Sequence, residues 1–111
     1  MRFHLEREGY RVSEAADGRQ TLDLLRNERP DVLLLDLTMP DVDGWEVLAR
    51  VRADGQLDDV HVAVLTADAD EVAEHRARRA GAEAYLVKPL EPVDLARAVR
   101  RLLAAEPPGP A

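Results

Sequence analysis

Apolar residues along this chain gather in short aliphatic runs, separated by stretches in which apolar positions recur every three or four residues. A continuous aliphatic run is typical of a strand buried on both faces of a parallel sheet. The runs therefore predict strands over Val32–Asp36, His61–Thr66 and Ala84–Val87. A looser alternation of apolar and polar residues over Tyr10–Ala15 predicts a further short strand.

Helical spacing fills the segments between these strands. The predicted helices are the last turns of one before Gly9, then about Arg19–Asn27, about Gly44–Ala53, from Asp68 or Asp70 to about Ala80, and from Pro92 to about Leu103. In the last of these the apolar stripe comprises Leu95, Ala98, Val99, Leu102 and Leu103. Strict alternation of helices and strands predicts an α/β fold with a doubly wound parallel sheet. We expect one domain over residues 1–105 and a flexible tail over residues 106–111.

Polar residues directly follow three of the aliphatic runs, namely Asp36, Thr66 and Lys88. Functional groups collect beyond the C-terminal ends of parallel strands, so we expect these side chains at one edge of the sheet. A carboxylate that faces an ammonium and a hydroxyl suits phosphoryl capture, because the carboxylate can attack phosphorus while the other two contact its oxygens. Taken singly, each residue has a simpler interpretation as a loop cap, a strand terminus or a surface lysine. Their combination favours the phosphoryl hypothesis.

Composition narrows the classes of function. The 111 residues suit a single domain, and 15 basic against 22 acidic residues give a net charge of −7, which argues against binding nucleic acid or an anionic membrane. The sequence has no cysteine, no apolar run long enough to span a membrane and no secretory signal at its start. We therefore expect a cytoplasmic protein without disulfides or zinc–thiolate sites.

Three segments, Leu33–Gly44, Val64–Ala67 and Tyr85–Pro89, resemble the receiver domain of bacterial response regulators in their order and spacing. The resemblance extends from about Arg2 to Leu103. It implies a flavodoxin-like receiver fold in two-component phosphorelay signalling, with a histidine kinase or phosphotransfer protein as the upstream partner.

The resemblance also implies roles for individual residues. It makes Asp36 the phosphoacceptor, Thr66 the switch hydroxyl and Lys88 the lysine that contacts the phosphate. It makes Tyr85 the switch aromatic, which rotates inward when Thr66 moves toward the phosphate and so changes the surface over about Ala69–Leu103. Pro89 is the proline that a cis bond usually precedes in the family. The backbone carbonyl of Thr38 and the carboxylate of Asp36 are the implied ligands of Mg²⁺.

One part of the family's pattern is missing from this sequence. That pattern begins with an aliphatic strand and two adjacent acidic residues, whereas this sequence begins inside the helix that follows them. Neither Glu6 and Glu8 nor the Asp58–Asp59 pair stands where it could replace the two acids. Because Mg²⁺ prefers several hard oxygen ligands, we expect weak or absent metal binding and slow or absent phosphoryl transfer to Asp36.

The missing strand lies in the middle of the family's sheet, beside Val32–Asp36. Either Tyr10–Ala15 closes up on Val32–Asp36, or another chain covers the exposed strand edge. We therefore predict a homodimer or a higher assembly. A further alternative is that Met1 is a late start and that the natural protein has the missing strand.

The leading hypothesis is a stand-alone receiver-like domain whose output is contact with other proteins, and which has no enzyme activity beyond self-phosphorylation at Asp36. One alternative is a degenerate receiver that is never phosphorylated and serves as a dimerisation or scaffold module. Another alternative is a ligand-binding or enzymatic flavodoxin-like domain. The sequence has neither a Gly-rich phosphate loop nor a nucleophile elbow, which argues against this alternative. The histidines His4, His61 and His75 are scattered, and we expect them to be structural.

Overall fold

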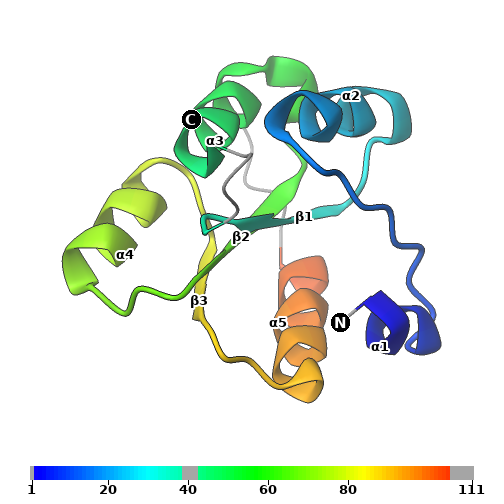
Figure 1. Ribbon diagram of the computed structural model, residues 1–111. Helices are drawn as coiled ribbons and strands as arrows, with labels where there is room; N and C mark the ends of the chain where they lie inside the picture. The colour runs from blue at the N-terminus through cyan, green and yellow to red at the C-terminus, as the bar shows by residue number, and fades with distance from the viewer. Residues whose placement is uncertain (1, 39–42, 106–111) are drawn as a thin grey trace.

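Three parallel strands form the sheet in the part of the chain that the computed structural model describes, residues 2–38 and 43–105, with side chains from residue 5 onward (Figure 1). The strands β1 (Val32–Asp36), β2 (His61–Thr66) and β3 (Ala84–Val87) lie in the order β1-β2-β3. All six residues of β2, the strand that pairs on both sides, are buried. The three strands predicted from aliphatic runs are confirmed. In the central strand β2, the apolar side chains match its burial on both faces.

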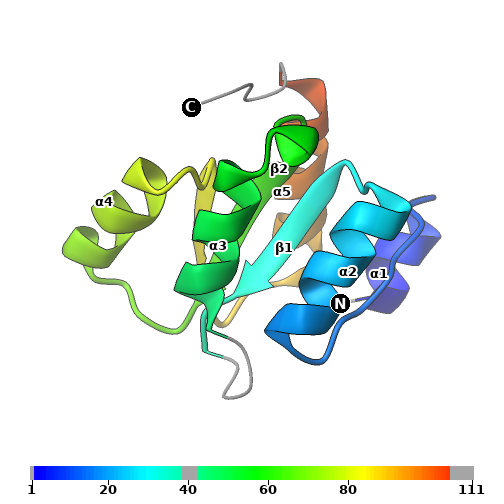
Figure 2. The same ribbon diagram turned by 90° about the horizontal axis from the view of Figure 1, so that it is seen from above.

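Five helices surround the described sheet: α1 (Arg2–Arg7), α2 (Gly18–Glu28), α3 (Gly44–Ala53), α4 (Glu71–Arg79) and α5 (Pro92–Ala104), with a short 3₁₀ turn at Gly55–Leu57. In Figures 1 and 2, α2, α3 and α4 cover one face, while α1 and α5 cover the other. Asp17, Asp43 and Asp70 each accept a hydrogen bond from a backbone N–H in the first turn of the helix that follows. The helix after β2 thus begins beyond Asp70 rather than Asp68.

A separate apolar core lies on each face of the sheet. Leu25, Leu48 and Val51 are fully enclosed between the sheet and the helices α2 and α3. Leu5 of α1 packs on the other face with Leu95 and Val99 of α5. The prediction that Leu103 is buried was wrong, because this side chain is 39% exposed. Leu102 already faces the core at that level of α5, and the next residue points about 100° away around the helix.

The prediction of a strand over Tyr10–Ala15 was also wrong, as was the idea that this segment closes up on β1. The segment has no strand conformation, and β1 pairs with β2 alone in the described sheet. Alternation of side chains is not sufficient for a strand, because the backbone N–H and C=O groups also need a neighbouring strand. Tyr10 and Val12 instead pack their side chains against the core beneath α1 and α5.

The second edge of β1 therefore remains open in the described part of the chain. The hydrogen bonds from His61 N–H to the Asp31 carbonyl and from Leu37 N–H to the Leu65 carbonyl show that odd-numbered residues face β2. Since backbone groups in a strand alternate between its two sides, those of Val32, Leu34 and Asp36 point away from β2.

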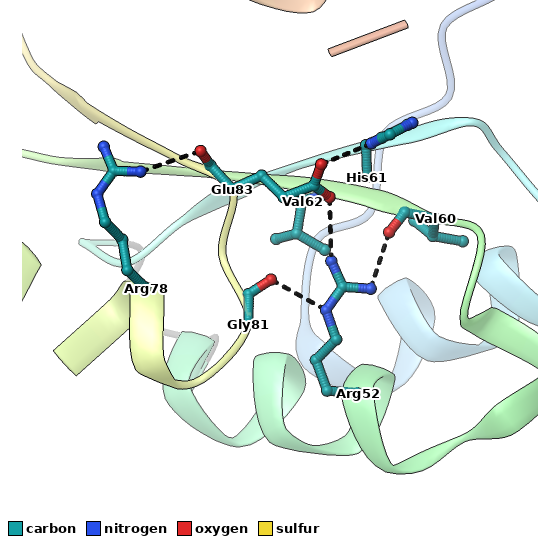
Figure 3. A network of polar contacts seen from close by, with 7 residues as sticks. All are labelled: Arg52, Val60, His61, Val62, Arg78, Gly81 and Glu83. Atoms are coloured by element: carbon teal, nitrogen blue, oxygen red, sulfur yellow. Dashed lines mark hydrogen bonds and ion pairs between the residues drawn. The ribbon is translucent and has the colours of Figure 1, made fainter. Parts of the chain in front are cut away.

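A polar network links the N-terminal ends of β2 and β3 to α3 (Figure 3). Arg52 of α3 donates to the carbonyls of Gly81 at 3.0 Å and Val60 at 2.9 Å, and its guanidinium lies 3.3 Å from Glu83 Oε1. The other carboxylate oxygen of Glu83 lies 2.7 Å from Nδ1 of the buried His61. We call Arg52, His61 and Glu83 the basal network, because it lies at the end of the sheet opposite to Asp36 and Lys88.

No helix in residues 2–38 and 43–105 is long and apolar enough to cross a membrane. Of the other two histidines, His75 is exposed on α4, and the His4 side chain lies outside the described part of the chain. The predicted tail, residues 106–111, and the middle of the predicted loop after Asp36, residues 39–42, also lie outside it.

Candidate functional site

Two of the predicted site residues meet directly at the C-terminal end of the sheet. β1 ends at Asp36, and Lys88 is the first residue after β3. The Lys88 ammonium donates to Asp36 Oδ2 at 2.5 Å, although 52 residues separate the two along the chain. The side chains are 34% and 26% exposed, so the ion pair is partly shielded but open to a molecule from solvent. The parallel register brings these strand ends together, because Lys88 N–H also donates to the Thr66 carbonyl.

Thr38 completes this group through its side chain. Its backbone N–H donates to Asp36 Oδ1 at 2.8 Å, and its hydroxyl lies 2.6 Å from the same oxygen. Lys88 Nζ lies 2.8 Å from the Thr38 hydroxyl oxygen. Each carboxylate oxygen of Asp36 thus accepts at least one hydrogen bond, and the three side chains form a closed ring of contacts.

These contacts set the charge of the acid. Burial alone would raise the pKa of Asp36, but hydrogen bonds from Lys88 and Thr38 to the carboxylate, together with the positive charge of Lys88, outweigh it. The net result is a pKa below the usual value for aspartate. Asp36 is therefore ionised at neutral pH, which a nucleophilic carboxylate requires.

Thr66 and Tyr85 form a second group beside the first. The Thr66 hydroxyl accepts a hydrogen bond from Asp68 N–H at 3.1 Å, and the Tyr85 hydroxyl donates to the Asp68 carbonyl at 2.7 Å. Burial of Tyr85 and the nearby Asp68 carboxylate raise the pKa of the phenol, so this hydroxyl keeps its proton and remains a donor. Both side chains are thereby attached to the β2–α4 loop, and neither contacts Asp36 by a hydrogen bond.

Lys88 has two further features. The peptide bond between Lys88 and Pro89 is cis, as the sequence resemblance implied. Lys88 is also the only lysine among the 15 basic residues of the chain, the others being arginines. A lysine ammonium is a compact charge with three donors, whereas the guanidinium of arginine is a broad planar fork. The Lys88 ammonium donates to both Asp36 and Thr38 from a single nitrogen and has a third N–H besides.

The described residues do not fit a Mg²⁺ site. Within residues 2–38 and 43–105, no group of three or more His, Asp or Glu side chains could hold a metal ion. Asp36 is a single carboxylate whose two oxygens already accept hydrogen bonds from Thr38 and Lys88. Mg²⁺ requires hard oxygen ligands in a near-octahedral arrangement, and Asp36 with the Thr38 carbonyl supplies too few of them.

Sequence reasoning identified most of this site but missed two contributions. It assigned Thr38 a role only through the backbone carbonyl, whereas the side-chain hydroxyl contacts both Asp36 and Lys88. The spacing Asp-x-Thr was an available signal, because an aspartate often bonds to a backbone N–H two residues onward. It also missed Asp68 as the shared partner of Thr66 and Tyr85, for which the sequence offered no signal.

The chain matches the family model described as the response regulator receiver domain over residues 1–100. It is 39% identical over 108 residues to an uncharacterized 14.6 kDa protein of Leptolyngbya boryana, covering 97% of this chain and 82% of that protein. It is 44% identical over 104 residues to the response regulator MprA of Mycolicibacterium vanbaalenii, covering 93% of this chain and 44% of MprA. The chain thus spans less than half the length of that regulator.

Solved structures show the same fold. A CheY-like receiver domain protein from Methanospirillum hungatei JF-1 superposes with a TM-score of 0.82 at 30% identity, covering 92% of this chain and 80% of that one. The chemotaxis protein CheY4 of Vibrio cholerae gives 0.83 at 32% identity, covering 90% and 83%. Receiver domains are signalling modules of two-component systems that typically bind Mg²⁺ and interact with histidine kinases or phosphotransfer proteins. The chain belongs to the response regulator receiver domain family.

Proposed function

We propose that this domain receives a phosphoryl group on Asp36 and passes the change on by contact with another protein. The observation that carries the proposal is the contact of Lys88, the chain's only lysine, with Asp36 and Thr38 at the C-terminal end of the sheet. A partly exposed carboxylate beside an ammonium is an arrangement suited to attack on phosphorus, because the ammonium can balance the charge of the incoming group.

The chemistry needs an ionised acid and a cation with a free donor. The lowered pKa of Asp36 supplies the first. Lys88 has three N–H donors, of which Asp36 and Thr38 use two. The third can donate to a phosphoryl oxygen without breaking the existing contacts.

The output would run through the second group of side chains. Thr66 and Tyr85 both bond to Asp68, which precedes α4. A shift of the Thr66 hydroxyl toward a phosphoryl group on Asp36 would break its hydrogen bond to the Asp68 N–H. Of these two hydrogen bonds, the β2–α4 loop would then keep only the one from Tyr85 to Asp68. The surface made by α4, β3 and α5 would then change, which is a local charge event acting on a two-state element.

The upstream partner in this proposal is a histidine kinase or phosphotransfer protein, and the output needs neither nucleic acid nor a membrane. We also propose that a second copy pairs along β1. The outward groups of Val32, Leu34 and Asp36 are self-complementary about a two-fold axis at Leu34, as an isologous antiparallel contact requires. Light scattering over a range of concentrations should give the mass of a dimer, and a monomer mass throughout would refute this assembly.

The test of phosphorylation is the intact mass after incubation with phosphoramidate, with and without MgCl₂. We expect the wild-type protein to gain one phosphoryl group slowly, with or without MgCl₂, because the described residues do not fit a Mg²⁺ site, and Asp36→Asn to gain none. Asp23→Asn is the matched control, since Asp23 lies on α2 and should leave the gain unchanged. A wild-type protein that gains no mass, or an Asp36→Asn variant that gains as much, would refute Asp36 as the acceptor.

A second candidate is a receiver that works without phosphate. The observation in its favour is that both oxygens of Asp36 already have partners within the chain, so the site is charge-balanced as it stands. This candidate predicts no mass gain under any condition. It also predicts that Asp36→Asn, which removes the charge but keeps the shape, changes the binding of the output partner.

A further inference from the structure

The Thr38 hydroxyl lies between the acid and the amine of the proposed phosphorylation site. Its oxygen is 2.6 Å from Asp36 Oδ1 and 2.8 Å from Lys88 Nζ. An ammonium can only donate, so the hydroxyl accepts from Lys88, and its own proton is directed to Asp36. The ammonium and the carboxylate thus fix the direction of both hydrogen bonds of the hydroxyl.

This arrangement makes the two oxygens of Asp36 chemically different. Oδ1 accepts from both the N–H and the hydroxyl of Thr38, which uses its two lone pairs. Among the residues that the structure describes, Lys88 is the one donor to Oδ2. An oxygen with a free lone pair is the better nucleophile, and the oxygen with two donors is suited to become the carbonyl of an acyl phosphate.

From this geometry we propose that Thr38 is a positioning residue of the phosphorylation site: its hydroxyl directs attack to Oδ2 and keeps Lys88 in place during the transfer. The proposal rests on the proposed function of Asp36. It assigns a role to a side chain, in addition to the backbone carbonyl that the family resemblance implies.

The transfer step can be written for phosphoramidate as donor. A lone pair of Asp36 Oδ2 forms the new O–P bond while the P–N bond breaks. The electron pair of that bond goes to nitrogen, which is already protonated in the zwitterionic donor and leaves as ammonia. Lys88 donates its third N–H to a phosphoryl oxygen and keeps its bond to Thr38. The Thr38 donors remain on Oδ1, which becomes the carbonyl oxygen.

If Thr38 had a purely structural role, loss of its hydroxyl would leave the rate of phosphoryl uptake unchanged. The bond from Thr38 N–H to Oδ1 is enough to hold the turn after β1, and it does not depend on the side chain. Thr38→Val keeps the N–H and the branched shape but loses the hydroxyl, whereas Thr38→Ser keeps the hydroxyl. Thr38 is exposed, so both variants should fold.

The first measurement is the rate of phosphoryl uptake by intact mass. We expect Thr38→Val to slow it about tenfold or more, the effect of one hydrogen bond to a charged group, and Thr38→Ser to stay within about threefold of the wild type. Thr21→Val is the control, because it deletes a threonine hydroxyl bonded to a backbone carbonyl on α2 and should leave the rate unchanged. Equal rates for wild type and Thr38→Val, or equal losses for the valine and serine variants, would overturn the proposal.

The second measurement does not need phosphorylation. Protein labelled with ¹⁵N-lysine has a single side-chain ammonium, since Lys88 is the only lysine. We expect a protonated Nζ signal in the wild type and in Thr38→Ser, and a weaker, faster-exchanging signal in Thr38→Val. Identical signals in wild type and Thr38→Val would show that Thr38 does not hold Lys88. A wild type that takes up no phosphoryl group would refute the proposed function, and the Nζ signals would still decide whether Thr38 positions Lys88.

Discussion

Replacing Arg52 by methionine should strongly destabilise the domain, because it removes the centre of the basal network while keeping the apolar stem of the side chain. Arg52 is only 10% exposed and makes three contacts, to the carbonyls of Gly81 and Val60 and to the Glu83 carboxylate (Figure 3). The variant leaves the two carbonyls without this donor and leaves Glu83 without this cation.

The size of the effect follows from burial. A hydrogen bond to a charged group contributes about 1.5–3 kcal/mol, although such values are not additive. Glu83 is 22% exposed and keeps its contact with His61, so water and the histidine offset part of the loss. We therefore expect the free energy of unfolding to fall by about 2–4 kcal/mol, near the lower end of the range for breaking a buried ion pair. In a domain of this size the melting temperature should fall by roughly 10–20 °C.

Urea unfolding followed by circular dichroism measures this change, and Arg50→Met is the matched control. Arg50 lies on the same helix and pairs with Glu46, but both side chains are more than half exposed. Such i,i+4 pairs contribute only about 0.3–0.5 kcal/mol. If both variants lose the same free energy, the basal network does not contribute more than an exposed ion pair, and the reasoning from burial is refuted.

Three further predictions concern stability. Leu48→Ala should lower the free energy of unfolding by about 2–5 kcal/mol, because the side chain is fully enclosed; a loss below about 1 kcal/mol in urea unfolding would contradict the packing described. Gly81→Ala should cost more than Gly9→Ala in the same assay: both glycines have positive φ, but only the Cβ at position 81 would meet the side chain of Arg52, at 2.5 Å. Equal losses would mean that Arg52 moves aside freely. Because the pKa of Asp36 is lowered by folding, its contribution to stability is present above the unfolded pKa of about 3.9 and is lost as pH falls through the folded pKa. The wild type should therefore lose more stability than Asp36→Asn between pH 5 and the acid limit of folding, and parallel curves would contradict this.

The aliphatic runs predicted the sheet correctly because burial on both faces leaves a strong signal in the sequence. The same strands carried Asp36 and Lys88 to one edge, so the main contact of the site followed from topology. The strand prediction for Tyr10–Ala15 was wrong because side-chain alternation is a local property. A strand also needs a neighbouring strand, which is often distant in the sequence. The apolar positions Tyr10 and Val12 do contact a core, although not from a strand.

The side-chain contacts of the basal network could not be predicted from the sequence. Arg52 and Glu83 are 31 residues apart, and each is a charged residue that would ordinarily be assigned to a solvated surface. Their burial depends on how α3 crosses the start of β2, which periodicity does not specify. The Thr38 side chain is an intermediate case, since its spacing from Asp36 was visible but the approach of Lys88 was not.

The 52-residue separation of Asp36 and Lys88 has a consequence for how the domain folds. Their contact closes a long loop, and the entropic cost of that closure must be met before the contact contributes any free energy. The local partner of Asp36 among the described residues is Thr38, which lies two residues away and does not shorten the loop to Lys88. The pair therefore forms only when β1, β2 and β3 are all aligned, so a partly folded chain, however rich in helix, lacks the Asp36–Lys88 contact on which the proposed acceptor site depends.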